Sequence, residues 1–259
     1  MISIPLPNGR SMPALGLGTW DLRGQACEAA VAEALKIGYR HVDTAEMYGN
    51  EAEIGRALKA SGLSRRDLFV TTKVWTNHHR AGDFKRAAGD SLRRLGLSEV
   101  DLLLIHWPNP SVPLEETVGA LCQVAREGQA LSIGVSNFDA ALLKKALSLA
   151  TVPLSCDQVP YSLPENQDAL LARARAAKVA VCAYTPLGRG SFLSRPELGK
   201  VAARHARTPA QVALRWLVQQ DGVAAIPKAA GPGHLKENFE IFDFELDRED
   251  GKLLERCRG

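Results

Sequence analysis

The sequence predicts an α/β protein, a (β/α)8 TIM barrel with an N-terminal β-hairpin and extra C-terminal helices. Short apolar segments of strand length alternate with helical segments eight times along the chain. The strand segments are apolar throughout, as expected for parallel strands that are buried on both faces. The length of 259 residues suits one barrel, so we expect residues 1–259 to form a single domain.

Asn8-Gly9 between short apolar stretches predicts a hairpin that caps the barrel over residues 1–14. The barrel strands are expected at residues 15–19, 40–43, 67–73, 100–106, 130–138, 154–158, 179–186 and 222–228. Helices are expected at residues 25–37, 51–60, 83–95, from 114, and at 142–150, 166–177, 196–205, 209–220, 233–239 and from 248. Thr208 is a natural N-cap for the helix that begins at Pro209.

An open, doubly wound sheet is the main rival fold. It would need a glycine-rich loop after an early strand, but the stretch LGLGTW at residues 15–20 lacks the third glycine of G-x-G-x-x-G. Trp20 stands where a phosphate group would have to approach. The barrel is therefore the prediction.

Composition excludes several classes of function. Hydrophobic residues make up 46% and charged residues 24%, which is typical of a globular protein. The net charge of +3 is spread along the chain without a Lys/Arg block, so no nucleic-acid partner is expected. No apolar run approaches a membrane span, and the N-terminus is too polar for a secretory signal. The five scattered cysteines show neither metal spacing nor a disulfide framework, which favours a cytoplasmic location.

Polar residues occupy the ends of the predicted strands. Asp43 ends the second strand, Tyr48 lies on the loop after it, and Lys73 and His106 end the third and fourth. Since the carboxyl ends of all barrel strands open onto one face, these residues should meet there. Asp43 and Lys73 come from neighbouring strands, and a buried charge is costly unless it is paired, so we expect an ion pair between them.

These residues stand in stretches that resemble the aldo-keto reductases, in particular bacterial members similar to 2,5-diketo-D-gluconate reductase. The resemblance covers nearly the whole chain, through LGLGTW, GYRHVDTAEMYGNE, TTKVW, VDLLLIHWP, IGVSNF, AYTPLGRG, TPAQVALRW and the region from IPK to EN. It implies an NAD(P)H-dependent carbonyl reductase with a catalytic tetrad of Asp43, Tyr48, Lys73 and His106.

The chemistry of these residue types supports that implication. A lysine ammonium beside a tyrosine should lower the pKa of the phenol, which is ordinarily near 10. Asp43 would keep Lys73 charged, Tyr48 would protonate the carbonyl oxygen, and His106 would orient that oxygen. Taken alone, three of these residues also have a purely structural explanation. Asp43 could form an ion pair at the barrel rim, Tyr48 could anchor its loop, and His106 could be a hydrogen-bonded core histidine. His41 alternates with Asp43, so we expect it to be a buried structural residue.

No side chain delivers hydride, so the mechanism needs a nicotinamide. The resemblance assigns Ser136, Asn137 and Gln158 to its carboxamide, Tyr184 to its ring, and Glu237 and Asn238 to adenine. The loop of Thr185–Gly190, with Leu187 and Gly188, would cradle the pyrophosphate. Its alternative reading is an ordinary glycine-rich surface loop.

The 2′-phosphate site departs from the family pattern. Lys228 is present, but Ala229 replaces a serine and His234 stands where NADP-preferring relatives have an arginine. A histidine does not replace a bidentate arginine well. We therefore expect NADPH to be preferred by a reduced margin, with real activity on NADH.

The substrate pocket is expected to be apolar and open. The resemblance places Trp20, Trp75 and Trp107 around it together with His106, while Trp216 should pack in the core. The chain ends soon after its last helix, where many relatives continue into a closing loop. We expect small and medium aldehydes, α-dicarbonyls, and keto acids or esters as substrates, and a monomer.

Two other functions stay open. A metal-dependent barrel hydrolase would need several His, Asp or Glu ligands at the strand ends. Only His106 and Asp43 qualify, and His78-His79 are expected in a solvent-facing loop, so no metal is expected. A non-catalytic member of the fold could keep the cofactor site alone, but the presence of both Tyr48 and Lys73 argues against it.

Overall fold

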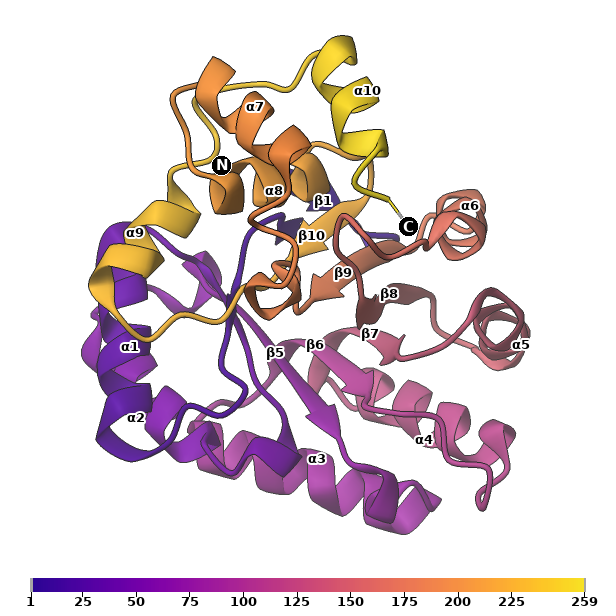
Figure 1. Cartoon of the computed structure of the whole chain (residues 1–259). Coiled ribbons are helices and arrows are strands. Elements are labelled where there is room, and N and C mark those ends of the chain that lie inside the picture. The colour runs from indigo at the N-terminus through magenta and orange to yellow at the C-terminus, as the bar shows by residue number, and fades with distance from the viewer. Residues whose placement is uncertain (1, 259) are drawn as a thin grey trace.

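The computed structural model describes residues 2–258 and shows eight parallel strands surrounded by helices (Figure 1). Each strand pairs with the next one in the chain. The strands are β3 (Leu17–Gly18), β4 (His41–Asp43), β5 (Phe69–Val74), β6 (Val100–Ile105), β7 (Ala130–Ser136), β8 (Leu154–Pro160), β9 (Ala180–Tyr184) and β10 (Val223–Ala225). Parallel bridges from Leu15 to Ala225 and from Gly18 to Lys228 join the first strand to the last, so the sheet closes. The predicted (β/α)8 barrel is confirmed.

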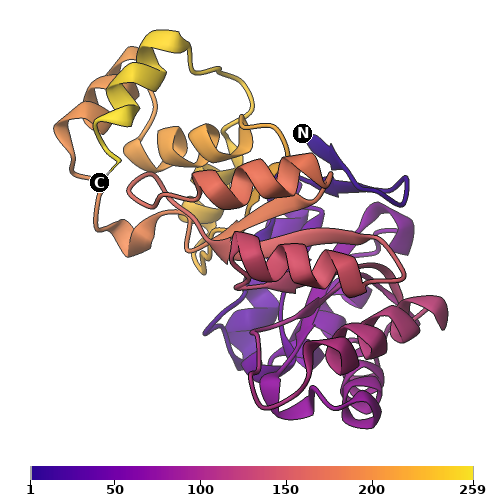
Figure 2. The same cartoon turned by 90° about the vertical axis from the view of Figure 1, so that its right-hand side faces the viewer.

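Helices follow the strands and cover the outside of the sheet. They are α1 (Gly24–Ile37), α2 (Glu51–Ala60), α3 (Ala81–Leu95), α4 (Leu114–Arg126), α5 (Ala140–Leu149), α6 (Asp168–Ala176), α8 (Pro209–Val218) and α9 (Pro232–Phe239). Two further helices, α7 (Pro196–Arg204) and α10 (Arg248–Glu255), lie side by side at one end of the molecule (Figure 2). They share with α8 a second, smaller apolar core that includes Phe192, Leu198 and Leu254. The predicted extra helices near the C-terminus are present.

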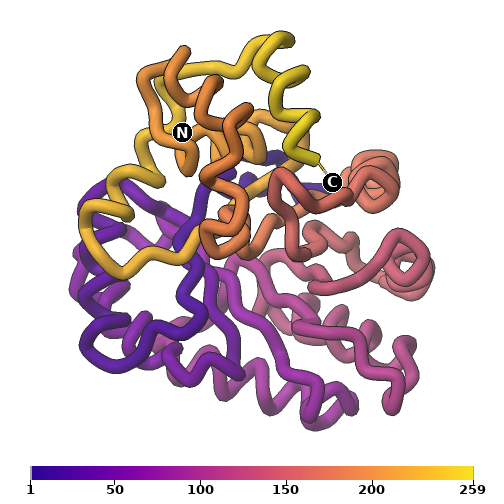
Figure 3. The backbone as a smooth tube through the Cα atoms, in the orientation of Figure 1, coloured from indigo at the N-terminus to yellow at the C-terminus, as the bar shows by residue number. Residues whose placement is uncertain are grey.

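The N-terminal hairpin closes the barrel at the end where the strands begin. Its strands are β1 (Ser3–Pro5) and β2 (Ser11–Pro13), and Met12 is fully buried beneath it. The Asn8 side chain donates to the carbonyl of Leu131, and Arg10 pairs with Asp101, so the hairpin is fixed to the starts of β6 and β7. The hairpin does not cover the opposite end of the barrel, where the strands end. Figure 3 shows the path of the chain around the barrel.

Most predicted elements are observed, with differences of a few residues at their ends. The third barrel strand continues one residue past Lys73, to Val74. The first and last strands are shorter than predicted. Hydrogen bonds nevertheless continue past their ends, from the Gly16 amide to the Ala225 carbonyl and from the Gly18 amide to the Pro227 carbonyl. Thr208 caps α8 as predicted, in a capping box with Gln211.

The histidine and tryptophan predictions have different outcomes. His41 is buried, with its Nε2 3.1 Å from the Thr71 hydroxyl, as predicted. Trp216 is partly buried and packs on Tyr161, also as predicted. The prediction that His79 faces solvent is wrong, because its ring packs beside Phe84 and is buried.

No helix within residues 2–258 is both long enough and apolar enough to cross a bilayer.

Candidate active site

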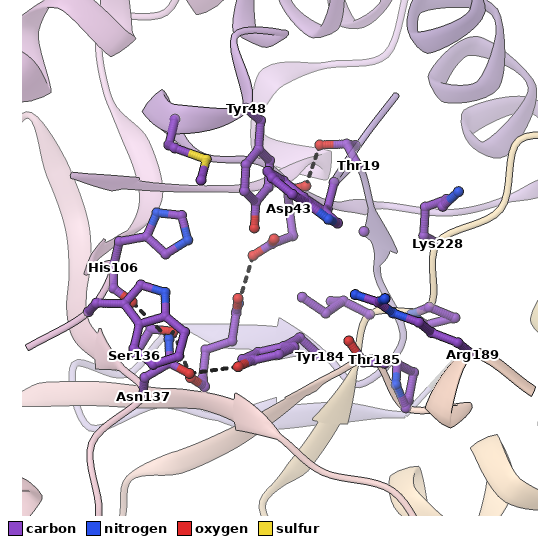
Figure 4. Close-up of a pocket in the computed structure, with 18 of the residues that line it drawn as sticks. Thr19, Asp43, Tyr48, His106, Ser136, Asn137, Tyr184, Thr185, Arg189 and Lys228 are labelled. Carbon is purple, nitrogen blue, oxygen red and sulfur yellow. Dashed lines mark hydrogen bonds between the residues drawn. The ribbon is translucent and has the colours of Figure 1, made fainter. Parts of the chain in front are cut away.

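A cavity of about 480 Å³ opens where the barrel strands end. Its lining comes from the ends of most strands and the loops after them. It comprises Gly18, Thr19, Trp20, Asp43, Met47, Tyr48, Trp75, His106, Trp107, Ser136, Asn137, Gln158, Tyr184, Thr185, Pro186, Leu187, Arg189, Ile226, Pro227 and Lys228. Figure 4 shows His106 at one end of the cavity, Lys228 and Arg189 at the other, and Tyr48 between them.

A buried lysine connects the acid and the phenol at the base of this cavity. Lys73 Nζ lies 2.6 Å from Asp43 Oδ1 and 2.8 Å from the carbonyl oxygen of Thr44, to both of which it donates. The same ammonium lies 3.3 Å from the hydroxyl of Tyr48. Lys73 and Asp43 are both buried, as the ion pair predicted from neighbouring strands requires. The ion pair is therefore present, and it directs one N–H of the lysine at the phenol.

The pKa of Tyr48 does not move in the predicted direction. Burial raises it above its ordinary value, and the nearby Lys73 charge opposes that shift without reversing it. Burial likewise opposes the charge on Lys73, but Asp43 and Tyr48 outweigh it and hold the pKa of Lys73 above its ordinary value. The phenol consequently stays protonated at neutral pH, beside a lysine that stays charged.

His106 begins the loop after β6, and its ring is largely buried. Burial and the charge on Lys73 lower the pKa of His106 to about 3, so the imidazole is neutral at physiological pH. Its ring lies between two aromatic neighbours, Tyr48 and Trp75, at centroid distances of 5.6 and 5.0 Å, both edge to face. A neutral ring held in this way has one N–H to offer a ligand.

The wall that faces Tyr48 carries amide and hydroxyl groups. The Asn137 side chain donates to the carbonyl oxygen of His106 at 2.9 Å and accepts from the Tyr184 hydroxyl at 2.7 Å. The Ser136 hydroxyl donates to the carbonyl oxygen of Gln158. These bonds tie the ends of β6, β7, β8 and β9 together (Figure 4).

Gln158 links this wall to the buried acid. Its amide nitrogen donates to Asp43 Oδ2 at 2.7 Å, so each carboxylate oxygen of Asp43 has a buried partner. No described residue donates to the amide oxygen of Gln158, which lines the cavity and is left for a donor from a ligand.

The loop after β9 has an unusual backbone. Thr185, Gly188, Arg189 and Gly190 all have positive φ, between 50° and 87°. Three amides here already donate to carbonyls of the same loop: Gly188 to Thr185, Gly190 to Leu187, and Ser191 to Gly188. Gly188 cannot be enlarged here, since an added Cβ would stand 2.9 Å from the Phe192 ring. Of the predicted residues of this loop, Thr185 and Leu187 line the cavity, whereas Gly188 does not.

Not every predicted cofactor residue reaches the cavity lining. Lys228 does, but His234, Glu237 and Asn238 of α9 do not. Glu237 accepts from the Thr208 hydroxyl and lies 3.2 Å from the exposed His234 ring. Asn238 is buried. The α9 residues thus lie apart from the cavity, and their predicted contacts stay predictions.

The tryptophans predicted at the pocket surround its mouth. Trp20 and Trp107 are each 44% exposed, and the Trp20 ring packs edge to face on Tyr48 at 4.9 Å. Met47 is also exposed beside them. The mouth is therefore an apolar rim around a polar base.

Some residues of the site were missed by the sequence reasoning. Arg189 lines the cavity, and no described residue forms an ion pair with it. Asn50 is fully buried and bonds the Thr19 and Leu22 carbonyls and the Thr44 hydroxyl, which fixes the loop below Tyr48. The sequence signals were an arginine in a glycine-rich loop and an asparagine beside Tyr48, but neither reveals where its side chain points.

Within residues 2–258, no group of three or more His, Cys, Asp and Glu residues is arranged to hold a metal ion.

A TIM barrel whose polar residues gather where the strands end has the arrangement of a barrel enzyme. The sequence profile of the Aldo/keto reductase family matches residues 14–258. The chain therefore belongs to the aldo-keto reductase family and is an oxidoreductase.

Comparisons with individual proteins and solved structures also place the chain among the aldo-keto reductases. The chain is 43% identical over 248 residues to an aldo-keto reductase of Mycobacterium tuberculosis (strain H37Rv), which spans 95% of this chain and 88% of that protein. It superposes on the crystal structure of a candidate 2,5-diketo-D-gluconic acid reductase B with a TM-score of 0.95 and 42% identity, covering 100% of this chain and 92% of the other. A mutant of Gox0644 in complex with NADPH gives a TM-score of 0.93 and 35% identity, covering 100% and 94%.

Proposed function

We propose that this protein reduces carbonyl compounds with NADPH, and that Tyr48 is the general acid. The observation that carries the proposal is the buried chain from Asp43 through Lys73 to the Tyr48 hydroxyl, with a neutral His106 beside it. Tyr48 is protonated at neutral pH and lines the cavity, so it has a proton to give to a bound oxygen. Proton donation of this kind contributes about 10²- to 10⁴-fold to a rate.

The other three residues support that donation. Lys73 stays charged because Asp43 compensates its burial, and its positive charge stabilises the phenolate that remains after the proton leaves. His106 offers its N–H to the carbonyl oxygen and orients it. A neutral imidazole suits this task, because it donates without competing with Tyr48 as an acid.

The cavity wall fits a nicotinamide cofactor. The free amide oxygen of Gln158, with the groups of Ser136 and Asn137, matches a carboxamide, which both donates and accepts hydrogen bonds. A nicotinamide supplies the hydride that no side chain can provide. Tyr184 would lie against its ring, and the Thr185–Gly190 loop, including Leu187 and Gly188, would hold the pyrophosphate. Arg189 adds a positive charge at that end of the cavity.

NADPH is proposed over NADH by a reduced margin. Lys228 lines the cavity and offers one ammonium to a 2′-phosphate. His234 is largely exposed and lies beside Glu237, an arrangement that matches a bidentate arginine poorly. Glu237 and Asn238 are the proposed adenine contacts.

The mouth favours apolar, modest-sized carbonyl substrates. Trp20, Trp75 and Trp107 present flat surfaces to the cavity, which suits aldehydes, α-dicarbonyls and keto acids or esters.

The test is to mix the protein with phenylglyoxal or methylglyoxal and follow the oxidation of NADPH and of NADH by absorbance. We expect turnover with both cofactors and a higher kcat/KM with NADPH. Tight NADPH binding without turnover of any aldehyde would instead indicate a non-catalytic binding protein. Equal kcat/KM values, or a preference for NADH, would contradict the cofactor assignment.

A further inference from the structure

One carboxylate connects two loops at the mouth of the cavity. Glu46 begins the short helix η1 (Glu46–Tyr48), and its side chain is only 15% exposed. Its Oε2 accepts a hydrogen bond from the backbone N–H of Trp75 at 2.9 Å. Its Oε1 lies 2.6 Å from Nδ1 of His78, in the helix η3 (Thr76–His78). Glu46 thus connects the loop after β4 to the loop after β5.

These two loops carry aromatic walls on either side of His106. Tyr48 ends η1, and Trp75 directly precedes η3. Both rings contact the His106 ring edge to face and both line the cavity. The distance between the two walls therefore depends on how η1 is held against η3.

The Trp75 amide has no strand partner on this side. β4 ends at Asp43, and the last amide to pair beyond it is that of Thr44, which donates to the carbonyl of Thr71. The Glu46 carboxylate takes the place of the missing strand. A backbone N–H bound to an ionised carboxylate is a charge-assisted hydrogen bond, stronger than one between neutral groups.

The outer side of the same loop is fixed by other groups. Asn109 donates to the carbonyl of Thr76, and Thr117 donates to the carbonyl of His79. These bonds secure the loop after β5 to the neighbouring α4 side of the barrel. Neither of these bonds reaches η1. The hydrogen bond from the Trp75 amide to Glu46 does join the loop after β5 to the helix that carries Tyr48.

We propose that Glu46 is a positioning residue that holds the walls formed by Trp75 and Tyr48 at the spacing a substrate needs. It touches no reacting atom. Loss of its acceptor oxygens frees the Trp75 amide and lets that wall move away from His106. Tyr48 keeps its contact with Lys73, so the proton donor itself stays in place.

The kinetic test compares Glu46→Ala with Glu46→Gln, and it rests on the carbonyl reduction proposed above. For Glu46→Ala we expect the KM for phenylglyoxal to rise about five- to tenfold while kcat changes less than about threefold, the pattern of lost ground-state binding. Glu46→Gln keeps an acceptor oxygen for the Trp75 amide and should restore the KM to within about twofold. The Kd for NADPH should not change in either variant.

A second measurement does not need turnover. In Glu46→Ala, tryptophan fluorescence should become more sensitive to acrylamide quenching, and this increase should vanish when Trp75 is also replaced by Phe. If the unmodified protein reduces no carbonyl, the proposed function fails, and the quenching comparison still decides this inference. Unchanged KM and unchanged quenching in Glu46→Ala would overturn it. A Glu46→Ala variant with both a lower melting temperature and a weaker affinity for NADPH would also overturn it, because that result would indicate general destabilisation.

Discussion

At the scale of single residues, burial determines which side chains of the site are charged at neutral pH. Burial raises the pKa of Tyr48 and lowers that of His106, so both side chains are uncharged at neutral pH. Lys73 and Asp43 are buried as well, but each compensates the charge of the other. The result is a neutral donor pair, Tyr48 and His106, beside a fixed ion pair, an arrangement that suits a polarised carbonyl oxygen.

The protonation state of His106 can be tested by NMR. Its pKa of about 3 lies below the ordinary histidine value of about 6.5. Since the folded-state pKa is depressed, the stabilisation associated with neutral His106 is complete above about pH 6.5 and is lost as the pH falls toward 3. We expect the ring C2 proton of His106, assigned by its absence in His106→Asn, to keep a constant chemical shift from pH 8 to pH 5. A titration midpoint between 6 and 7 would contradict the account.

At the scale of elements, sequence pattern and structure agree where the cause is local. The alternation of apolar strands and helices located every barrel element, because burial on both faces of a parallel sheet leaves little choice of residue. The Asp43–Lys73 pair was predictable because the two residues stand at the carboxyl ends of neighbouring strands. Thr208 was recognisable as a cap because a hydroxyl before Pro209 is a local signal.

The elements that depend on distant contacts were not predictable in this way. His79 looked like a surface residue, but its loop folds back over Phe84. The pKa of Tyr48 depends on how deeply the barrel and the Trp20 ring bury it, which the sequence does not reveal. Arg189 adopts a positive φ that only the folded loop imposes, so its place at the cavity could not be derived from its neighbours.

The cap of α8 provides a prediction at this scale. The Thr208 hydroxyl accepts from the Gln211 amide and donates to Glu237, so it joins α8 to α9. We expect Thr208→Ala to lower the free energy of unfolding by about 0.5–2 kcal/mol. Thr208→Ser keeps the hydroxyl and is the matched control, which should lose less. Chemical denaturation measures both, and equal losses in the two variants would show that the cap does not stabilise the helix.

At the scale of the whole molecule, the barrel depends on the seam where its first and last strands meet. Gly18 bridges Lys228 across this seam, and an added Cβ would stand 2.5 Å from the carbonyl oxygen of Ile226. That oxygen belongs to the backbone and cannot rotate away. The seam therefore both closes the barrel and places Lys228 at the cavity.

Enlarging Gly18 should consequently open the seam. We expect Gly18→Ala to destabilise the protein by about 1–3 kcal/mol, as overpacking does, and to weaken NADPH binding through Lys228. Gly119 is the control, because it lies exposed in α4 with no atom near its added Cβ. Gly119→Ala should stabilise the helix by about 0.5–1 kcal/mol. Denaturant unfolding and cofactor titration check both, and a Gly18→Ala variant as stable as the unmodified chain would refute the steric argument.

The central claim is that the buried ion pair supports Tyr48 as the proton donor for a carbonyl oxygen. The most direct measurement is single-turnover reduction of phenylglyoxal by the NADPH-loaded protein and by its Tyr48→Phe variant, alongside the Kd of each for NADPH. Removing only the hydroxyl should slow the reaction by about 10²- to 10⁴-fold and leave the Kd within about twofold. A Tyr48→Phe variant that reduces phenylglyoxal at the rate of the unmodified protein would contradict the account.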